Sequence, residues 1–253
     1  MTLGVLYDST KCVGCRQCEA GCCEKWGLPY NDKIAAEEKL SAHKLTAIRT
    51  FSGGERFARR MCMHCEEPAC ASVCPVGALH KTALGPVVYD QEKCIGCRYC
   101  MAACPFGVPT YEWTSLTPRV RKCDGCSERK ANGKATACTE ACPTGATITG
   151  ERDALIEEAR KRIAENPKDY YPRIYGLKEV GGTDTLFLSA VPFDQIGLRT
   201  DLPQEALPNL TWRVLSAVPD VAGVGSVLLG GVYWITHRRE AVAKAEGTKA
   251  RTR

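Results

Sequence analysis

The chain has 253 residues, of which 44% are hydrophobic and 25% charged, so it can form one large or two small domains. Its formal net charge of +5 counts all 17 cysteines as neutral. Use of these cysteines as thiolate ligands would remove the positive charge, so nucleic-acid binding through basicity has little support.

Sixteen of the 17 cysteines fall into four groups of four. In chain order these groups are Cys12, Cys15, Cys18 and Cys22; Cys62, Cys65, Cys70 and Cys74; Cys94, Cys97, Cys100 and Cys104; and Cys123, Cys126, Cys138 and Cys142. The third group has the bacterial ferredoxin spacing C-x2-C-x2-C-x3-C-P and ends at Pro105. The first has the same cysteine spacing with Cys23 in place of the proline, and the other two are variants.

This spacing predicts four [4Fe-4S] clusters, because soft thiolates suit iron-sulfide cores and four cysteines give each cubane iron one protein ligand. With four oxidised clusters the net charge becomes about −3. Structural zinc is the alternative, but it usually uses two C-x2-C pairs separated by a longer loop. A disulfide framework would leave one cysteine over.

Two internal repeats support the cluster interpretation. Residues 8–18 and 90–100 share the frame D-x-x-K-C-x-G-C-R-x-C, and residues 69–78 and 137–146 share A-C-x-x-x-C-P-x-G-A. Glycine lets backbone amides approach the sulfurs, and proline makes the turn after the last ligand rigid. The residues expected in these roles are Gly14, Gly77, Gly96, Gly145, Pro75, Pro105 and Pro143.

The segment after the cysteine motifs is different in kind. Residues 151–166 predict a surface helix, with Ile156, Ala159 and Ile163 on one face and Pro167 ending it. Residues 167–216 contain many prolines and glycines and predict an extended arm with one strand.

Residues 217–236 predict one transmembrane helix. The segment contains a single charged residue, Asp220, and ends with Tyr233 and Trp234 at the expected membrane interface. A buried helix of a soluble protein is the alternative. A stripe of small residues predicts close packing against partner helices: Ala222, Ser226 and Gly230.

The flanking charges predict the orientation of this helix. The tail over residues 237–253 is basic, whereas residues 194–216 contain only Arg199 and Arg213 as basic residues. The basic residues of the tail are Arg238, Arg239, Lys244, Lys249, Arg251 and Arg253. We therefore expect a cytoplasmic C-terminus and a periplasmic cluster domain at the inner membrane. Only eleven residues precede Cys12 and none forms a signal sequence, so we expect a partner to supply the export signal.

These features together resemble the iron-sulfur subunits of respiratory molybdenum enzymes and membrane-bound hydrogenases. The resemblance rests on the four motifs over residues 8–150, the phrases C-M-H-C-E-E-P-A-C and C-P-V-G-A-L, and the C-terminal anchor. The nearest types are the beta subunit of formate dehydrogenase-N and the ferredoxin subunit of hydrogenase-2. Hydrogenase-2-type subunits usually bear a twin-arginine signal. This sequence shows none, so we expect the formate dehydrogenase type.

The resemblance implies that the first motif pairs with the fourth and the second with the third, each motif lending its last cysteine to its partner. The implied ligand sets are Cys12, Cys15, Cys18 with Cys142; Cys123, Cys126, Cys138 with Cys22; Cys62, Cys65, Cys70 with Cys104; and Cys94, Cys97, Cys100 with Cys74. Cys23 is then spare, and we expect it to be a buried small apolar residue.

The implied fold is α+β, with two ferredoxin-like modules over residues 1–150. The resemblance implies an electron-transfer subunit without catalysis of its own, between a catalytic subunit and a membrane cytochrome b that reduces quinone. The implied catalytic partner is a molybdenum or tungsten formate dehydrogenase. The alternatives are a [NiFe] hydrogenase and a molybdopterin reductase for dimethyl sulfoxide or polysulfide.

The four histidines offer no ligand set: His43, His64, His80 and His237.

Overall fold

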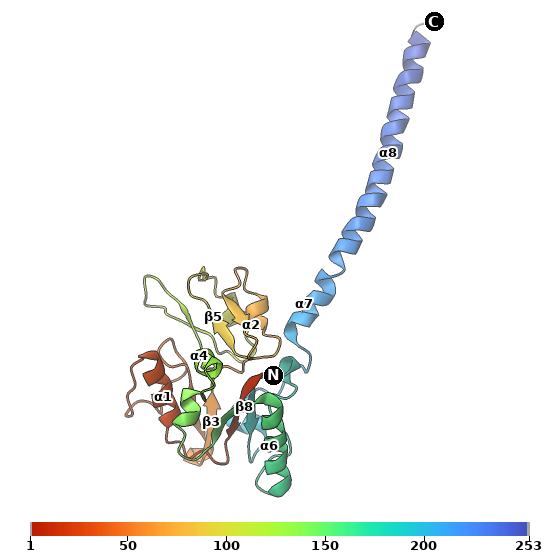
Figure 1. The fold of residues 1–253 in the computed structure, drawn as a ribbon. Coiled ribbons are helices and arrows are strands. Elements are labelled where there is room, and N and C mark those ends of the chain that lie inside the picture. Colours follow the sequence, from red (N-terminus) through yellow and green to blue (C-terminus); the bar gives the residue numbers. More distant parts are fainter. Residues whose placement is uncertain (1, 252–253) are drawn as a thin grey trace. The chain divides into compact units, whose positions relative to one another are not determined.

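The computed structural model describes residues 2–251, without the side chains of Ser52 and residues 248–251. The chain forms two units, Met1–Pro208 and Asn209–Arg253. The first unit contains every cysteine motif, and the second consists of helix (Figure 1).

A three-stranded sheet forms the centre of the first unit. Its order is β8-β1-β9, with β1 (Leu3–Asp8) antiparallel to β8 (Thr147–Glu151) and parallel to β9 (Thr185–Leu188). Strand side chains alternate between the two faces of a sheet. Leu6 therefore packs with helix α6 (Arg152–Glu165), whereas Tyr7 packs with several of the cysteines.

Three two-stranded hairpins connect the cysteine motifs. They are β2 (Ala47–Phe51) with β3 (Arg56–Arg60), β4 (Leu79–Lys81) with β5 (Val87–Tyr89), and β6 (Thr110–Tyr111) with β7 (Val120–Arg121). Short 3-10 turns complete the unit: η1 (Ser52–Gly54), η2 (Glu179–Gly181) and η3 (Phe193–Ile196).

Each motif also contains a short helix. The helices are α1 (Gln17–Trp26), α2 (Ala69–Ser72), α3 (Tyr99–Ala103), α4 (Ser127–Ala131) and α5 (Ala137–Glu140). Helix α1 packs against α5, and α2 packs against α3. The chain therefore brings the first motif to the fourth and the second motif to the third.

The two sequence repeats have matching backbones. Gly14 and Gly96 both have φ of 71°, and the following Arg16 and Arg98 lie in the same left-handed region, at 56° and 62°. Left-handed φ is rare for arginine and arises here because the chain must turn sharply between two cysteines and the helix that follows. The repeated cysteine spacing thus corresponds to a repeated loop.

Residues 167–206 differ from the predicted extended arm. Strand β9 pairs with β1, and Tyr175, Phe187 and Phe193 pack edge-to-face or tilted at ring-centroid distances of 5.2 and 6.2 Å. All three rings are buried. The short apolar runs of this segment become stable only against β1, about 180 residues earlier in the chain, and local patterns do not show such a pairing.

Helix α7 (Leu207–Leu215) begins at the end of the first unit, and the second unit contains the rest of α7 and all of α8 (Val218–Arg251). Helix α8 covers residues 218–236 of the predicted span and continues through most of the basic tail. One stretch, Leu207–Gly247, is long and apolar enough to cross a membrane, and none of its most apolar window is buried within the protein. Side chains at Lys249 and Arg251 are not described, and Arg253 lies outside the described residues.

Leu186→Ala tests whether β9 belongs to the core. Leu186 is fully buried, so its truncation should cost about 2–5 kcal/mol and lower the unfolding temperature of the purified protein by roughly 5–15 °C. Circular dichroism in detergent measures this. The control Leu116→Ala alters a fully exposed leucine and should have almost no effect. Equal unfolding temperatures for the two variants would place β9 outside the core.

Candidate metal centres

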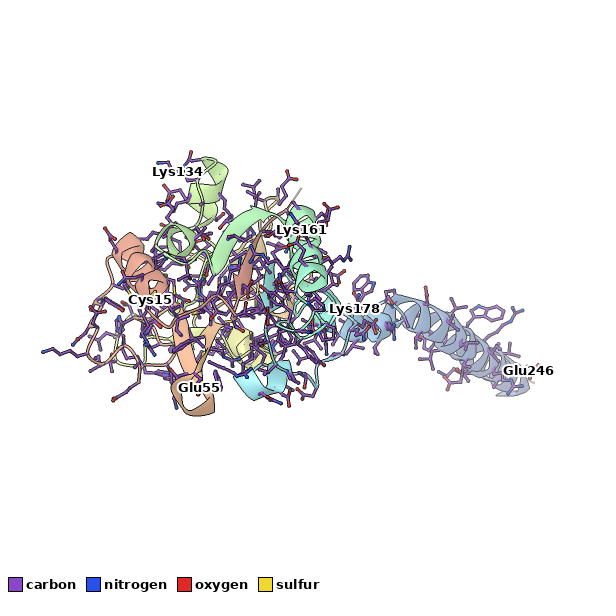
Figure 2. All side chains as sticks on the ribbon, turned by 90° about the horizontal axis from the view of Figure 1, so that it is seen from below. Cys15, Glu55, Lys134, Lys161, Lys178 and Glu246 are labelled. Atoms are coloured by element: carbon purple, nitrogen blue, oxygen red, sulfur yellow. The ribbon has the colours of Figure 1, made fainter. Side chains whose placement is uncertain are left out.

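The cysteines of the first unit range from buried to exposed. None of the 17 forms a disulfide. Eight are buried: Cys18, Cys22, Cys23, Cys62, Cys100, Cys123, Cys126 and Cys138. Cys15 and Cys97, the equivalent residues of the two repeated loops, are the exposed ones (Figure 2 labels Cys15).

Within the described part of the chain, no three His, Cys, Asp or Glu side chains converge closely enough to hold a single metal ion. Tetrahedral zinc would need four sulfurs about 2.3 Å from one point. A [4Fe-4S] core separates its thiolates further, because each of them binds a different iron.

Thiols of the second and third motifs lie close together. Burial raises the pKa of Cys65 well above its usual range, and nearby thiols raise it further: Cys62, Cys104 and Cys70. Burial likewise raises the pKa of Cys100 to about 11, with contributions from Cys94, Cys97 and Cys74. Each neighbourhood contains three cysteines of one motif and the last cysteine of the other.

Thiols of the first and fourth motifs are also neighbours. Burial raises the pKa of Cys22, and Cys138 and Cys126 raise it further. Burial raises the pKa of Cys18 to about 12, and both Cys138 and Cys12 add to this effect.

Two backbone hydrogen bonds, donated by the amides of Asp8 and Asp90, bring cysteines of different motifs close together. The amide of Asp8 donates to Ala146 O at 2.7 Å, which draws the loop of Cys12 and the turn of Cys142 together. The amide of Asp90 donates to Ala78 O at 2.7 Å and does the same for Cys94 and Cys74.

Backbone amides surround several of the sulfurs. Gly96 N donates to Cys94 Sγ at 3.4 Å and Gly125 N to Cys123 Sγ at 3.3 Å. Around Cys74 burial is outweighed by amide donors that lower its pKa, from Leu79, Val76, Ala78 and Gly77. Amides of Thr147, Thr144 and Ala146, with the Thr144 hydroxyl, do the same for Cys142. Such donors stabilise thiolates, so the C-P-x-G turns fit bound iron.

Arg59 on β3 was missed by the sequence analysis. Its side chain is 1% exposed, and Nε donates to Thr46 Oγ1 at 2.8 Å and Nη1 to Thr147 Oγ1 at 3.2 Å. Burial lowers its pKa, but Cys138 and Cys18 raise it by more, so the guanidinium stays charged. A buried cation here partly offsets the negative charge of thiolates. The residue lies outside every motif, so spacing gave no signal for it.

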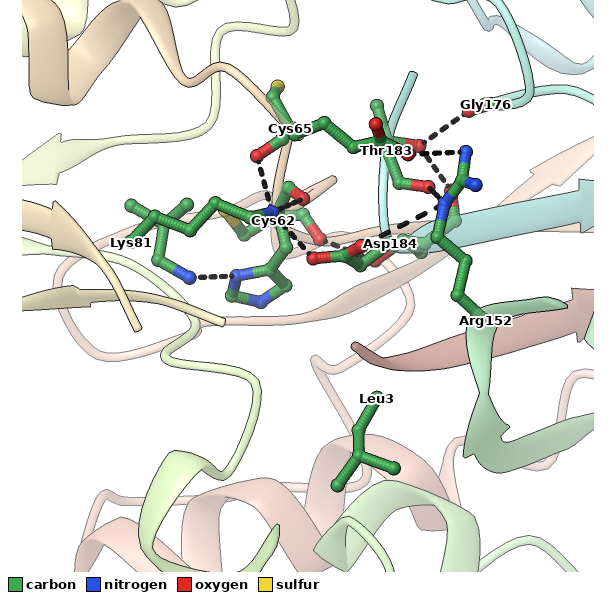
Figure 3. Close-up of polar contacts among 12 residues, drawn as sticks. Leu3, Cys62, Cys65, Lys81, Arg152, Gly176, Thr183 and Asp184 are labelled. Atoms are coloured by element: carbon green, nitrogen blue, oxygen red, sulfur yellow. Dashed lines mark hydrogen bonds and ion pairs between the residues drawn. The ribbon is translucent and has the colours of Figure 1, made fainter. Parts of the chain in front are cut away.

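Polar contacts attach the second motif to β9. Lys81 Nζ donates to Cys65 O at 2.8 Å and to Asp184 Oδ2 at 2.7 Å (Figure 3). Arg152 Nε donates to Thr183 O at 3.0 Å from the beginning of α6. The segment predicted to be an arm therefore helps to hold the Cys62–Cys65 loop in place.

Cys23 is buried, and the side chains in the repeated loops differ in their exposure. Cys23 is 3% exposed, and its sulfur lies 4.0 Å from His43 O. The side chain of Arg16 is only 15% exposed, and Arg98 lies over the Trp113 ring at 5.1 Å. Tyr99 is 60% exposed.

Comparisons with known proteins agree with this site. Residues 55–152 match the family model described as a 4Fe-4S dicluster domain. The Hydrogenase-2 operon protein HybA of Escherichia coli O157:H7 is 36% identical over 78% of this chain and 73% of its own length. The chain belongs to the iron-sulfur subunits of respiratory oxidoreductases.

Two other relatives extend the comparison. The formate dehydrogenase iron-sulfur subunit of Haemophilus influenzae is 33% identical over 91% of this chain and 79% of its own length. The B subunit of the anaerobic dimethyl sulfoxide reductase of Escherichia coli K12 is 38% identical over 63% of this chain and 76% of its own length. Members of this family transfer electrons through 4Fe-4S clusters and are not catalytic on their own.

Cys22→Ser and Cys23→Ser together test which of these neighbours binds iron. Cys22 lies beside Cys138 and Cys126, whereas the charged neighbours of Cys23 are Lys44, Glu19 and Glu38. We expect Cys22→Ser to lose about four irons per chain and Cys23→Ser to lose none. Elemental analysis measures both. Iron loss in Cys23→Ser alone would reverse the assignment.

Proposed function

We propose that this iron-sulfur subunit transfers electrons through four [4Fe-4S] clusters, between a catalytic subunit and a membrane cytochrome b that reduces quinone. The observation that carries the proposal is that thiols of different motifs lie together, and around Cys65 and Cys100 three thiols of one motif lie beside the last of another. When bound, the clusters would supply one-electron redox chemistry. The chain would hold them in place, with seven of the sixteen proposed ligand cysteines buried.

The proposed ligand sets are those implied by the family resemblance. Three are supported by the neighbourhoods of Cys65, Cys100 and Cys22. For Cys12, Cys15, Cys18 and Cys142, support comes from the proximity of Cys12 to Cys18 and from the bond of Asp8 to Ala146. The packing of α1 against α5 and of α2 against α3 supports two ferredoxin-like modules.

Contacts between sulfur sites also suggest the order of electron transfer. Cys18 lies near Cys138, linking the first set to the fourth-motif set. Cys123 lies near Cys62, linking the two modules. Cys70 lies near Cys100, linking the second set to the third. In this order the terminal clusters contain the exposed Cys15 and Cys97, which suits exchange with partner proteins.

For the catalytic partner we propose a formate dehydrogenase, with a [NiFe] hydrogenase as the alternative. The formate dehydrogenase subunit of Haemophilus influenzae aligns with 91% of this chain, compared with 78% for the hydrogenase-2 relative and 72% for a formate dehydrogenase subunit of Escherichia coli. The hydrogenase-2 relative is slightly more identical, at 36% against 33%. A dimethyl sulfoxide or polysulfide reductase is less favoured, since that relative aligns with only 63% of the chain.

Metal content of the complex purified through this subunit tests the partner. Molybdenum or tungsten together with iron is the result we expect, because the proposed partner is a formate dehydrogenase. Nickel in place of these metals would assign the subunit to a hydrogenase. An isolated chain without either metal would contradict the proposed assembly.

We further propose that residues 217–236, within the apolar helix Leu207–Gly247, form a single membrane span, with the cluster domain in the periplasm and the basic C-terminus in the cytoplasm. The apolar character of this stretch supports the span, and Arg238, Arg239 and Lys244 after it support the orientation.

Protease added to intact spheroplasts tests this orientation. The cluster domain should be degraded, while an epitope at the C-terminus should be protected until the membrane is permeabilised. Protection of the cluster domain in intact spheroplasts would contradict the proposed orientation.

A further inference from the structure

Two buried basic side chains connect the second and fourth cysteine motifs. His64, which lies between Cys62 and Cys65, is 2% exposed. Lys122, immediately before Cys123, is 7% exposed. His64 contacts a cysteine of the fourth motif, and Lys122 contacts a cysteine of the second motif.

His64 is oriented by the backbone of β5. Its Nδ1 accepts a hydrogen bond from Val87 N at 3.0 Å, so in the neutral ring the proton is on Nε2. The protonated Nε2 lies 3.7 Å from Cys123 Sγ and donates to it.

The room for this contact depends on Gly125. A Cβ at this position would approach His64 Nε2 to 3.0 Å, and Gly125 itself has a φ of +64°. His64 has a left-handed φ of 49°, which is uncommon for a residue with a side chain. The left-handed backbone of His64 and the absence of a side chain at Gly125 therefore both help to position the imidazole of His64.

Lys122 makes the reciprocal contact. Its Nζ lies 3.9 Å from Cys62 Sγ and donates to Cys123 O at 2.9 Å and to Val87 O. Val87 therefore fixes both side chains, because its N–H binds His64 and its carbonyl oxygen binds Lys122. The two N–H···S contacts run in opposite directions between the same pair of motifs.

We propose that His64 and Lys122 form a reciprocal bridge between the two modules, and that this bridge sets the potentials of the clusters ligated by Cys123 and Cys62. The inference rests on the proposed function. In the transfer step one electron moves between these two clusters, so one is oxidised and the other reduced. No bond forms or breaks, and both nitrogens keep their protons. Hydrogen bonds and positive charge beside a ligand sulfur favour the reduced cluster.

The side chains act as positioning residues, so the test measures potentials. His64→Asn retains an acceptor for Val87 N and tolerates left-handed φ, but it cannot reach Cys123. Lys122→Met removes the cation beside Cys62. Redox titration of the intact purified complex, followed by electron paramagnetic resonance, should show that each variant weakens reduction of one cluster about tenfold, or about 59 mV, and that the two affected clusters differ.

Matched variants separate this role from a structural one. His64→Gln places a donor near the former Nε2 position, and Lys122→Arg keeps the charge, so both should restore most of the potential. Lys161→Met removes a charge at a side chain that is 66% exposed and should leave every potential unchanged (Figure 2 labels Lys161). Iron content is measured for each variant.

The outcomes are distinct. Unchanged potentials in His64→Asn and Lys122→Met with full iron content would overturn the bridge and leave the proposed function intact. A shift of the same cluster in both variants would also overturn it. If one variant lost iron, the other would still decide its half of the bridge. Absence of iron-sulfur signals from the wild-type complex would instead overturn the proposed function.

Discussion

The structure depends on one constraint: thiols inside the protein core must lose their protons to bind iron. Burial, reinforced by neighbouring thiols, raises the pKa of Cys18 and Cys70 to about 12, so without metal these thiols remain protonated at neutral pH. Iron must replace those protons, and cluster binding is therefore coupled to formation of the core. Backbone amides, Arg59 and Lys122 all offset the negative charge that iron binding creates.

The sheet and hairpins give these thiols their positions. Strand β1 ends just before Cys12 and β8 begins just after Cys142, so their antiparallel pairing joins the first and fourth motifs. The β4-β5 hairpin joins Cys74 and Cys94 in the same way. Short helices then pack in pairs across these joints. Strand pairing at the ends of the cysteine motifs thus orders the first unit.

Sequence patterns predicted the local parts of this arrangement well. Cysteine spacing and the repeated C-x-G-C-R frame correspond to repeated loops with the same left-handed residues, because that information lies within a few residues. Helix α6 and the apolar C-terminal helix also follow local periodicity and composition. In contrast, the pairing of β9 with β1 and the placement of Arg59 beside Cys138 depend on residues far apart in the chain. No local pattern contains that information.

The most direct test of the account is the iron and acid-labile sulfide content of the chain, with Mössbauer spectra to identify the clusters. Four [4Fe-4S] clusters predict about 16 irons and 16 sulfides per chain, all in cubane sites. Zinc in place of iron would contradict the account. So would about eight irons, because half of the sixteen grouped cysteines would then have no cluster to bind.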